Sequence, residues 1–152
     1  MHGQGSLRAQ RVKESNDPDF IISMMVEQLS SAEVQEAGCA TLVPISVTET
    51  RAVAARGGIE AVVRAMGAHG SRETLQENGT RVLRNLATLE ENRALVAAKG
   101  GIEAVVKAMG ANGSYAPLQE NGCIFLNIIA LSDPRLQAQV QPCDCIRASR
   151  LP

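Results

Sequence analysis

The chain contains two nearly identical internal segments. Residues 57–71 read GGIEAVVRAMGAHGS and residues 100–114 read GGIEAVVKAMGANGS, so thirteen of fifteen positions are identical at an offset of 43 residues. The same offset relates LQENG at 75–79 to LQENG at 118–122, and a more divergent copy, VQEAG, occupies 34–38. Identity over this length at a fixed spacing indicates a repeat protein with a unit of about 42 residues.

Each repeat has the apolar spacing of helices. Ile59, Val62, Val63 and Met66 stand at i, i+3, i+4 and i+7, which places them on one helical face. No segment alternates with a period of two, so we expect an all-α protein. The pattern predicts short first helices at about 48–56, 90–98 and 133–140, second helices at about 19–29, 58–67 and 101–110, and third helices at about 31–46, 72–88 and 115–131.

Glycine and serine punctuate these helices. Gly57 and Gly100 begin Gly-Gly pairs between a first and a second helix, where a residue just past a helix end often adopts the left-handed conformation. Ser71 and Ser114 precede the third helices of two repeats and are predicted to cap them.

The core must be aliphatic, because the chain has two phenylalanines, one tyrosine and no tryptophan. The helical pattern places Leu83, Leu86, Val105 and Val106 in it. Three glycines, at 38, 79 and 122, recur inside the third helices, and we attribute them to close helix packing.

The repeats define the expected organisation of the chain. We predict a flexible segment at 1–18, repeats at 19–140 (about 19–56, 57–99 and 100–140), and a divergent, disordered tail at 141–152. Cys143 and Cys145 lie in that tail without a second pair of ligands at zinc-finger spacing, so we expect no metal site there.

Charge and composition exclude several function classes. The net charge of −1 disfavours binding to a nucleic-acid backbone, and no apolar stretch has the length of a membrane span. Cys39 and Cys123 occupy equivalent positions of different repeats, so they are not expected to pair. This cysteine usage predicts a reducing compartment, the cytoplasm with the nucleus as a second option. With two histidines and repeats that copy one another, we expect no catalysis and no cofactor.

The segments Leu75–Ala87 and Glu91–Ile102, recurring at this period, make the chain similar to the armadillo repeat family. The resemblance implies a right-handed α-solenoid of about three repeats, in which the third helices line a concave groove that holds an extended peptide. In the peptide-carrier branch, a tryptophan and an asparagine four residues later grip the peptide backbone. Asn85 matches that asparagine, but Arg81 occupies the tryptophan position. This departure disfavours a carrier of basic nuclear-import peptides.

We therefore predict a non-catalytic protein or peptide binder. The expected groove residues are Asn78, Arg81, Arg84, Asn85, Thr88, Asn121, Ile124, Asn127 and Ile128. Three alternatives remain for them: Asn85 bonds a neighbouring loop carbonyl, the arginines form a solvated helix face, and the isoleucines pack against a following element. Two further functions remain open, namely self-association through exposed terminal repeats and a regulatory repeat segment of a larger protein.

Overall fold

The computed structural model describes residues 2–140, and this part of the chain is helical with no strand. The all-α fold class predicted from the periodicity is confirmed. No helix in the described range is long and apolar enough to cross a membrane. The ten helices of residues 2–140 are α1 (His2–Lys13), α2 (Pro18–Glu27), α3 (Ala32–Thr48), α4 (Thr50–Ala55), α5 (Gly58–Ala68), α6 (Glu73–Ala87), α7 (Glu90–Ala98), α8 (Gly101–Ala111), α9 (Ala116–Ala130) and α10 (Pro134–Val140).

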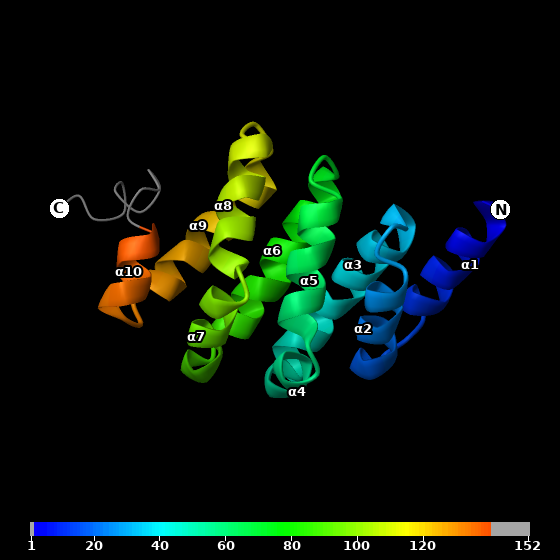
Figure 1. Cartoon of the computed structure of the whole chain (residues 1–152), viewed down its shortest axis with the longest axis horizontal. Helices are drawn as coiled ribbons and strands as arrows, with labels where there is room; N and C mark the ends of the chain where they lie inside the picture. Colours follow the sequence, from blue (N-terminus) through cyan, green and yellow to red (C-terminus); the bar gives the residue numbers. More distant parts are fainter. Residues whose placement is uncertain (1, 141–152) are drawn as a thin grey trace.

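The helices are stacked in two rows along the long axis of the molecule (Figure 1). Helices α1, α3, α6 and α9 pack successively against one another, while α2, α5 and α8 form the second row. Short helices α4 and α7 join the rows, and α10 packs on α9. Each predicted first, second and third helix corresponds to one observed helix, with ends that differ by a few residues.

The N-terminal segment differs from the prediction. Residues 1–18 were expected to be flexible, but α1 occupies most of this range and packs against α3. It buries Ala9 and Val12. Because α1 contains few other apolar residues, its sequence gives a weak helical pattern. The predicted tail at 141–152, with Cys143 and Cys145, lies outside the described residues.

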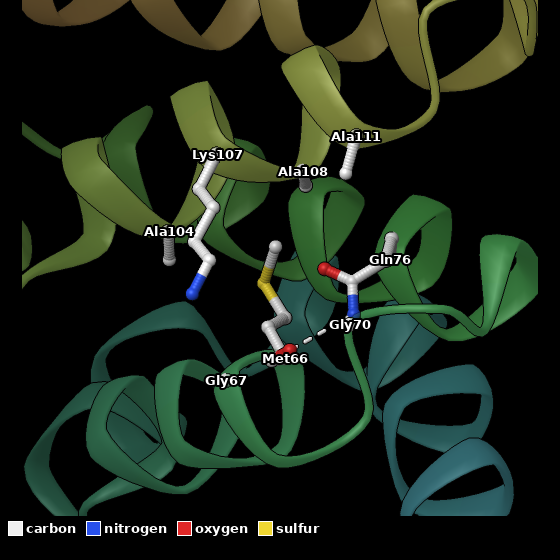
Figure 2. A pocket seen from close by; sticks show the side chains of 8 residues that line it. All are labelled: Met66, Gly67, Gly70, Gln76, Ala104, Lys107, Ala108 and Ala111. Carbon is white, nitrogen blue, oxygen red and sulfur yellow. Dashed lines mark hydrogen bonds between the residues drawn. The ribbon is translucent and has the colours of Figure 1, made fainter.

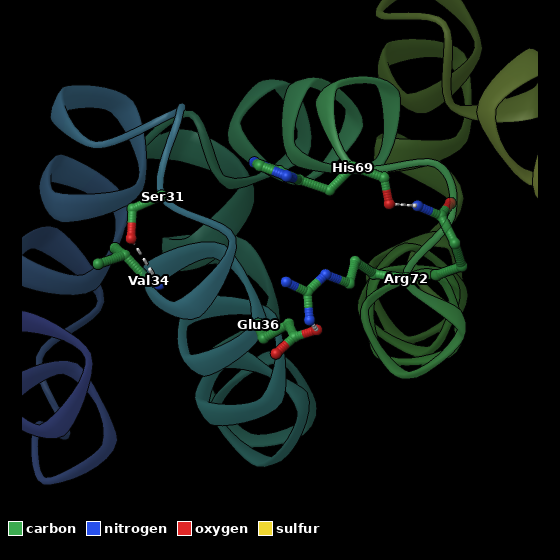
Figure 3. Close-up of polar contacts among 6 residues, drawn as sticks. Ser31, Val34, Glu36, His69 and Arg72 are labelled. Atoms are coloured by element: carbon green, nitrogen blue, oxygen red, sulfur yellow. Dashed lines mark hydrogen bonds and ion pairs between the residues drawn. The ribbon is translucent and has the colours of Figure 1, made fainter. Parts of the chain in front are cut away.

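Capping at the third helices also differs from the prediction. The residue before α6 is Arg72 and the residue before α9 is Tyr115, and neither helix has a side-chain cap. Ser71 and Ser114 lie one residue too early to accept from the first turn. In the first repeat the residue directly before the third helix is Ser31, whose Oγ accepts from the Val34 N–H at 3.3 Å (Figure 3).

The glycine pairs before α5 and α8 have the predicted geometry. Gly57 and Gly100 both have φ of 84°, in the left-handed region. The second glycine of each pair is required for space, because a Cβ at Gly58 would lie 2.7 Å from the Val53 carbonyl oxygen. These pairs fix the sharp turn that sends the chain from a short helix into the second row.

The glycines inside the third helices permit close contact with the second row. A Cβ at Gly79 would lie 2.8 Å from the side chain of Met66, and Gly38 and Gly122 face Met25 and Met109 in the same way. The packing explanation for these glycines is confirmed. A repeated methionine on α2, α5 and α8 therefore sets the distance between the two rows.

The core lies between the rows and is aliphatic. Leu83, Leu86 and Val105 are completely buried, as predicted, but Val106 is 37% exposed. Its counterpart one repeat earlier is Val63, which is half-buried and packs near Gly100 of the next repeat. Among the described residues no such neighbour covers Val106, which explains why the prediction for this residue is wrong.

Candidate protein-binding surface

A repeated glutamine fixes the start of each long helix in the α3, α6, α9 row. Gln35, Gln76 and Gln119 each donate Nε2 to two backbone carbonyls at the end of the preceding second-row helix. The acceptors are Met25 and Gln28, Met66 and His69, and Met109 and Asn112, at 2.9–3.0 Å. These bonds satisfy carbonyls that a helix end leaves without intrahelical partners. Sequence reasoning missed this role, although the recurring Q of VQE and LQE is its signal.

Asn85 is not available to a partner. It is 7% exposed, and its Nδ2 donates to the Val43 carbonyl at 3.2 Å and to Ser46 Oγ at 3.0 Å. It therefore ties α6 to α3. The alternative of an internal hydrogen bond to a carbonyl holds, although the acceptor lies in helix α3 and not in a loop, and the expectation that the Asn85 side chain lines a groove is wrong.

Arg84 and Asn121 are brought together and join α6 to α9. Arg84 donates from Nη1 to Asn121 Oδ1 at 2.6 Å, and Asn121 donates Nδ2 to the Pro117 carbonyl at 2.8 Å. Thr88 is exposed, and its hydroxyl donates to the Asn85 carbonyl at 2.6 Å. Most donors of these predicted residues are therefore engaged within the protein.

Asn78 lines a hollow between α1, α3 and α6 with a volume of about 440 Å³. Lys13 of α1 and Glu33 and Glu36 of α3 also line it. Glu36 is paired with Arg72 at 3.4 Å (Figure 3). The hollow is open and mixed in charge, and it extends the surface of the long-helix row toward α1.

Arg81 lies at the centre of the outer side of α6. Around the helix it lies between two sides of α6. Asn78 and Asn85 are on the side toward α3, and Arg84 is on the side toward α9. It is half-buried, and no hydrogen bond or ion pair holds its guanidinium to another described residue. Its equivalents in the flanking repeats are Ala40 and Ile124, which are both exposed.

Apolar side chains flank Arg81 on both neighbouring helices. Val47 of α3 is 64% exposed, Ile124 of α9 is 46% exposed, and Leu131 just after α9 is 85% exposed. Val47 and Leu131 occupy the position that Thr88 occupies in the middle repeat. We call this surface the third-helix face; its residues are Ala40, Pro44, Val47, Arg81, Thr88, Ile124, Ile128 and Leu131.

The two remaining predicted residues, Asn127 and Ile128, contribute less surface. Both are half-buried, and Ile128 packs against the core. Asn127 takes part in an interaction with its surroundings. Of the nine predicted residues, Thr88 and Ile124 are exposed, and Arg81 is half-buried with no hydrogen bond to another described residue.

Acidic groups beside this face accept hydrogen bonds from neighbouring repeats. The Tyr115 hydroxyl donates to Glu77 Oε2 at 2.7 Å. This hydrogen bond to a carboxylate, followed by burial, raises the pKa of Tyr115. Glu77 and Glu36 are thus engaged across neighbouring repeats, and neither is paired with Arg81.

No group of three or more metal-ligating side chains occurs among the described residues. His69 is part of the structural framework, because its Nε2 lies 2.7 Å from the Leu29 carbonyl oxygen of the preceding repeat. Figure 3 shows His69 and Arg72 close to one another. Comparisons with protein-family models, curated proteins and solved structures found no match to this chain.

Proposed function

We propose that the chain is an armadillo-like, right-handed α-solenoid that acts as a non-catalytic protein-binding scaffold. The partner is an extended segment that lies across the third-helix face, perpendicular to α3, α6 and α9. The observation that carries this proposal is the surface itself: an unpaired arginine at the centre, with exposed aliphatic side chains on both sides.

The side chains of this face suit two kinds of contact. Arg81 offers a planar group of N–H donors to a backbone carbonyl or carboxylate of the partner. Val47, Ile124 and Leu131 expose apolar surface that aliphatic side chains of the partner would remove from water. Asn85, Arg84 and Asn121 act indirectly, because their hydrogen bonds hold α3, α6 and α9 in register.

The experiment is affinity capture with matched variants, followed by mass spectrometry. Arg81→Ala and Ile124→Ala change the third-helix face, while Arg64→Ala and Val106→Ala change exposed residues of the same types on α5 and α8. We expect a partner that binds the wild type and the α5 and α8 variants but does not bind the two third-helix-face variants. A partner lost with the α5 and α8 variants alone would contradict it.

The alternative function is self-association or attachment to further repeats of a larger protein. It is favoured by Leu95 of α7 and Val106 of α8, which are 38% and 37% exposed. Light scattering of the purified chain tests it. A dimer that dissociates on dilution and is abolished by Val106→Glu would support self-association, and a monomer at all concentrations would exclude self-association.

A further inference from the structure

A small hollow lies between α5 and α8, on the row away from the third-helix face. Its volume is about 110 Å³, and its walls are mostly apolar (Figure 2). The lining residues are Met66, Gly67, Gly70, Gln76, Ala104, Lys107, Ala108 and Ala111.

The repeats allow this α5–α8 junction to be compared with the equivalent α2–α5 junction. The wall formed by α8 is nearly unchanged from that formed by α5, since Lys107 replaces Arg64 and three alanines recur in register. The opposite wall differs: Gly67 and Gly70 stand where the first junction has Val26 and Leu29. The second junction therefore lacks two aliphatic side chains that the first has, although Val26 is 50% exposed there.

The space beside the two glycines is open. A Cβ added at Gly67 or Gly70 would meet no atom within 4 Å, and neither residue has a positive φ. A side chain is therefore absent here without any steric or conformational need for glycine. Leu29, the counterpart of Gly70, is half-buried at its own junction.

Two polar groups bound the hollow. Gln76 is 2% exposed, and its Nε2 is used by the Met66 and His69 carbonyls at 3.0 Å. Figure 2 shows its carbonyl oxygen turned toward Ala108 and the hollow, where it can accept a hydrogen bond. Lys107 lines the same hollow, and its ammonium group has no ion-pair partner within residues 2–140.

We propose that this hollow binds the C-terminal residue of a partner peptide that ends in leucine or a similar aliphatic residue. The side chain takes the open space beside Gly67 and Gly70. The backbone N–H of that residue donates to Gln76 Oε1, and its carboxylate pairs with Lys107. A cavity of about 150 Å³ holds benzene, so a volume of about 110 Å³ suits a four-carbon branched chain.

This site is distinct from the third-helix face and does not depend on it. The α5–α8 hollow recognises one terminal residue, whereas the third-helix face is proposed to hold an extended segment. A failure of either proposal leaves the other intact, because the residues that line the hollow, Gln76 of α6 included, are not those of the third-helix face.

The test is an NMR titration of the ¹⁵N-labelled chain with N-acetyl-Ala-Ala-Leu as the free acid and as the C-terminal amide. The free acid should shift the amide signals of residues that line the hollow, on α5 and α8. The C-terminal amide should bind at least about tenfold more weakly than the free acid, because it cannot pair with Lys107. Equal binding of both peptides, or shifts confined to α3, α6 and α9, would overturn the proposal.

Two variants with matched controls make the test specific. Gly70→Leu restores the side chain of the first junction and should abolish binding, whereas Gly113→Leu, at the same position one repeat later, should not. Lys107→Gln should weaken binding of the free acid about tenfold, whereas Arg64→Gln should not. Circular dichroism checks that each variant is folded. Undiminished binding by folded Gly70→Leu protein would also overturn the proposal.

Discussion

Replacing Gln76 with methionine should destabilise the protein by about 2–4 kcal/mol. Methionine has a similar length and volume, so the change removes the Nε2 donor with little change in packing. The lost bonds are those to the Met66 carbonyl, which is buried, and to the His69 carbonyl, which is partly buried.

The magnitude follows from the environment of the two carbonyls. The Met66 carbonyl is among the last four of α5, which have no intrahelical partner, and leaving it unsatisfied in the core costs about 1–3 kcal/mol. The His69 carbonyl also accepts from the Arg72 N–H at 3.1 Å, so its loss is nearer the ordinary value of about 1 kcal/mol. For a chain of this size the sum lowers Tm by about 4–15 °C.

The matched control is Gln119→Met, which removes the same two bonds one repeat later. Both of those bonds are only partly buried, so the carbonyls can recruit water, and we expect a loss of about 1 kcal/mol. Thermal and urea unfolding followed by circular dichroism measure both variants. A Gln76→Met protein as stable as the wild type, or no more destabilised than Gln119→Met, would refute the structural role assigned to this glutamine.

Three other changes test the fold. Leu86→Ala should cost about 2–5 kcal/mol in unfolding free energy, since Leu86 is completely buried between the rows; an unchanged Tm would contradict this packing. Gly58→Ala should be strongly destabilising because its Cβ would strike a backbone carbonyl, whereas Gly67→Ala, in open space within α5, should stabilise by about 0.5–1 kcal/mol. Burial, with a smaller contribution from nearby Glu36, raises the pKa of Cys39 to about 12. At pH 8 it should therefore resist iodoacetamide until the chain unfolds, as peptide mass spectrometry would show.

The helical architecture could be predicted from the sequence because the repeats supply it several times over. The spacing of Ile59, Val62 and Met66, the Gly-Gly pairs and the glycines facing methionine all act locally or between adjacent helices. Such features leave a periodic signal. Helix α1 has no repeated counterpart and few apolar residues, so the same reasoning missed it.

The candidate surface was less predictable, since it depends on which side of each helix a neighbour covers. Asn85 and Arg81 are four residues apart on α6, yet Asn85 is buried and held by α3, whereas Arg81 is half-buried and makes no hydrogen bond to the described residues. Helical spacing alone places both near the same face. The direction of the Asn85 amide is decided by the Val43 carbonyl and Ser46, and only packing reveals that contact.

The α5–α8 hollow also required the structure, although a sequence signal exists. The exchange of Val26 and Leu29 for Gly67 and Gly70 is visible in the alignment of the repeats. Without the three-dimensional arrangement, however, glycines near a helix end are naturally interpreted as loop residues. Their location opposite α8 is what gives the exchange a physical consequence.

The most direct test of the central claim is site-specific photo-crosslinking from the third-helix face. The photo-reactive residue p-benzoyl-phenylalanine would replace Arg81 in one protein and Arg64, on α5, in another. After irradiation in extract, mass spectrometry would identify the captured chains and the crosslinked residues. We predict that position 81 captures one extended segment of a partner and that unlabelled wild-type protein competes with this capture. Position 64 should not capture that segment. Capture of that same segment from position 64 and not from position 81 would contradict binding across α3, α6 and α9.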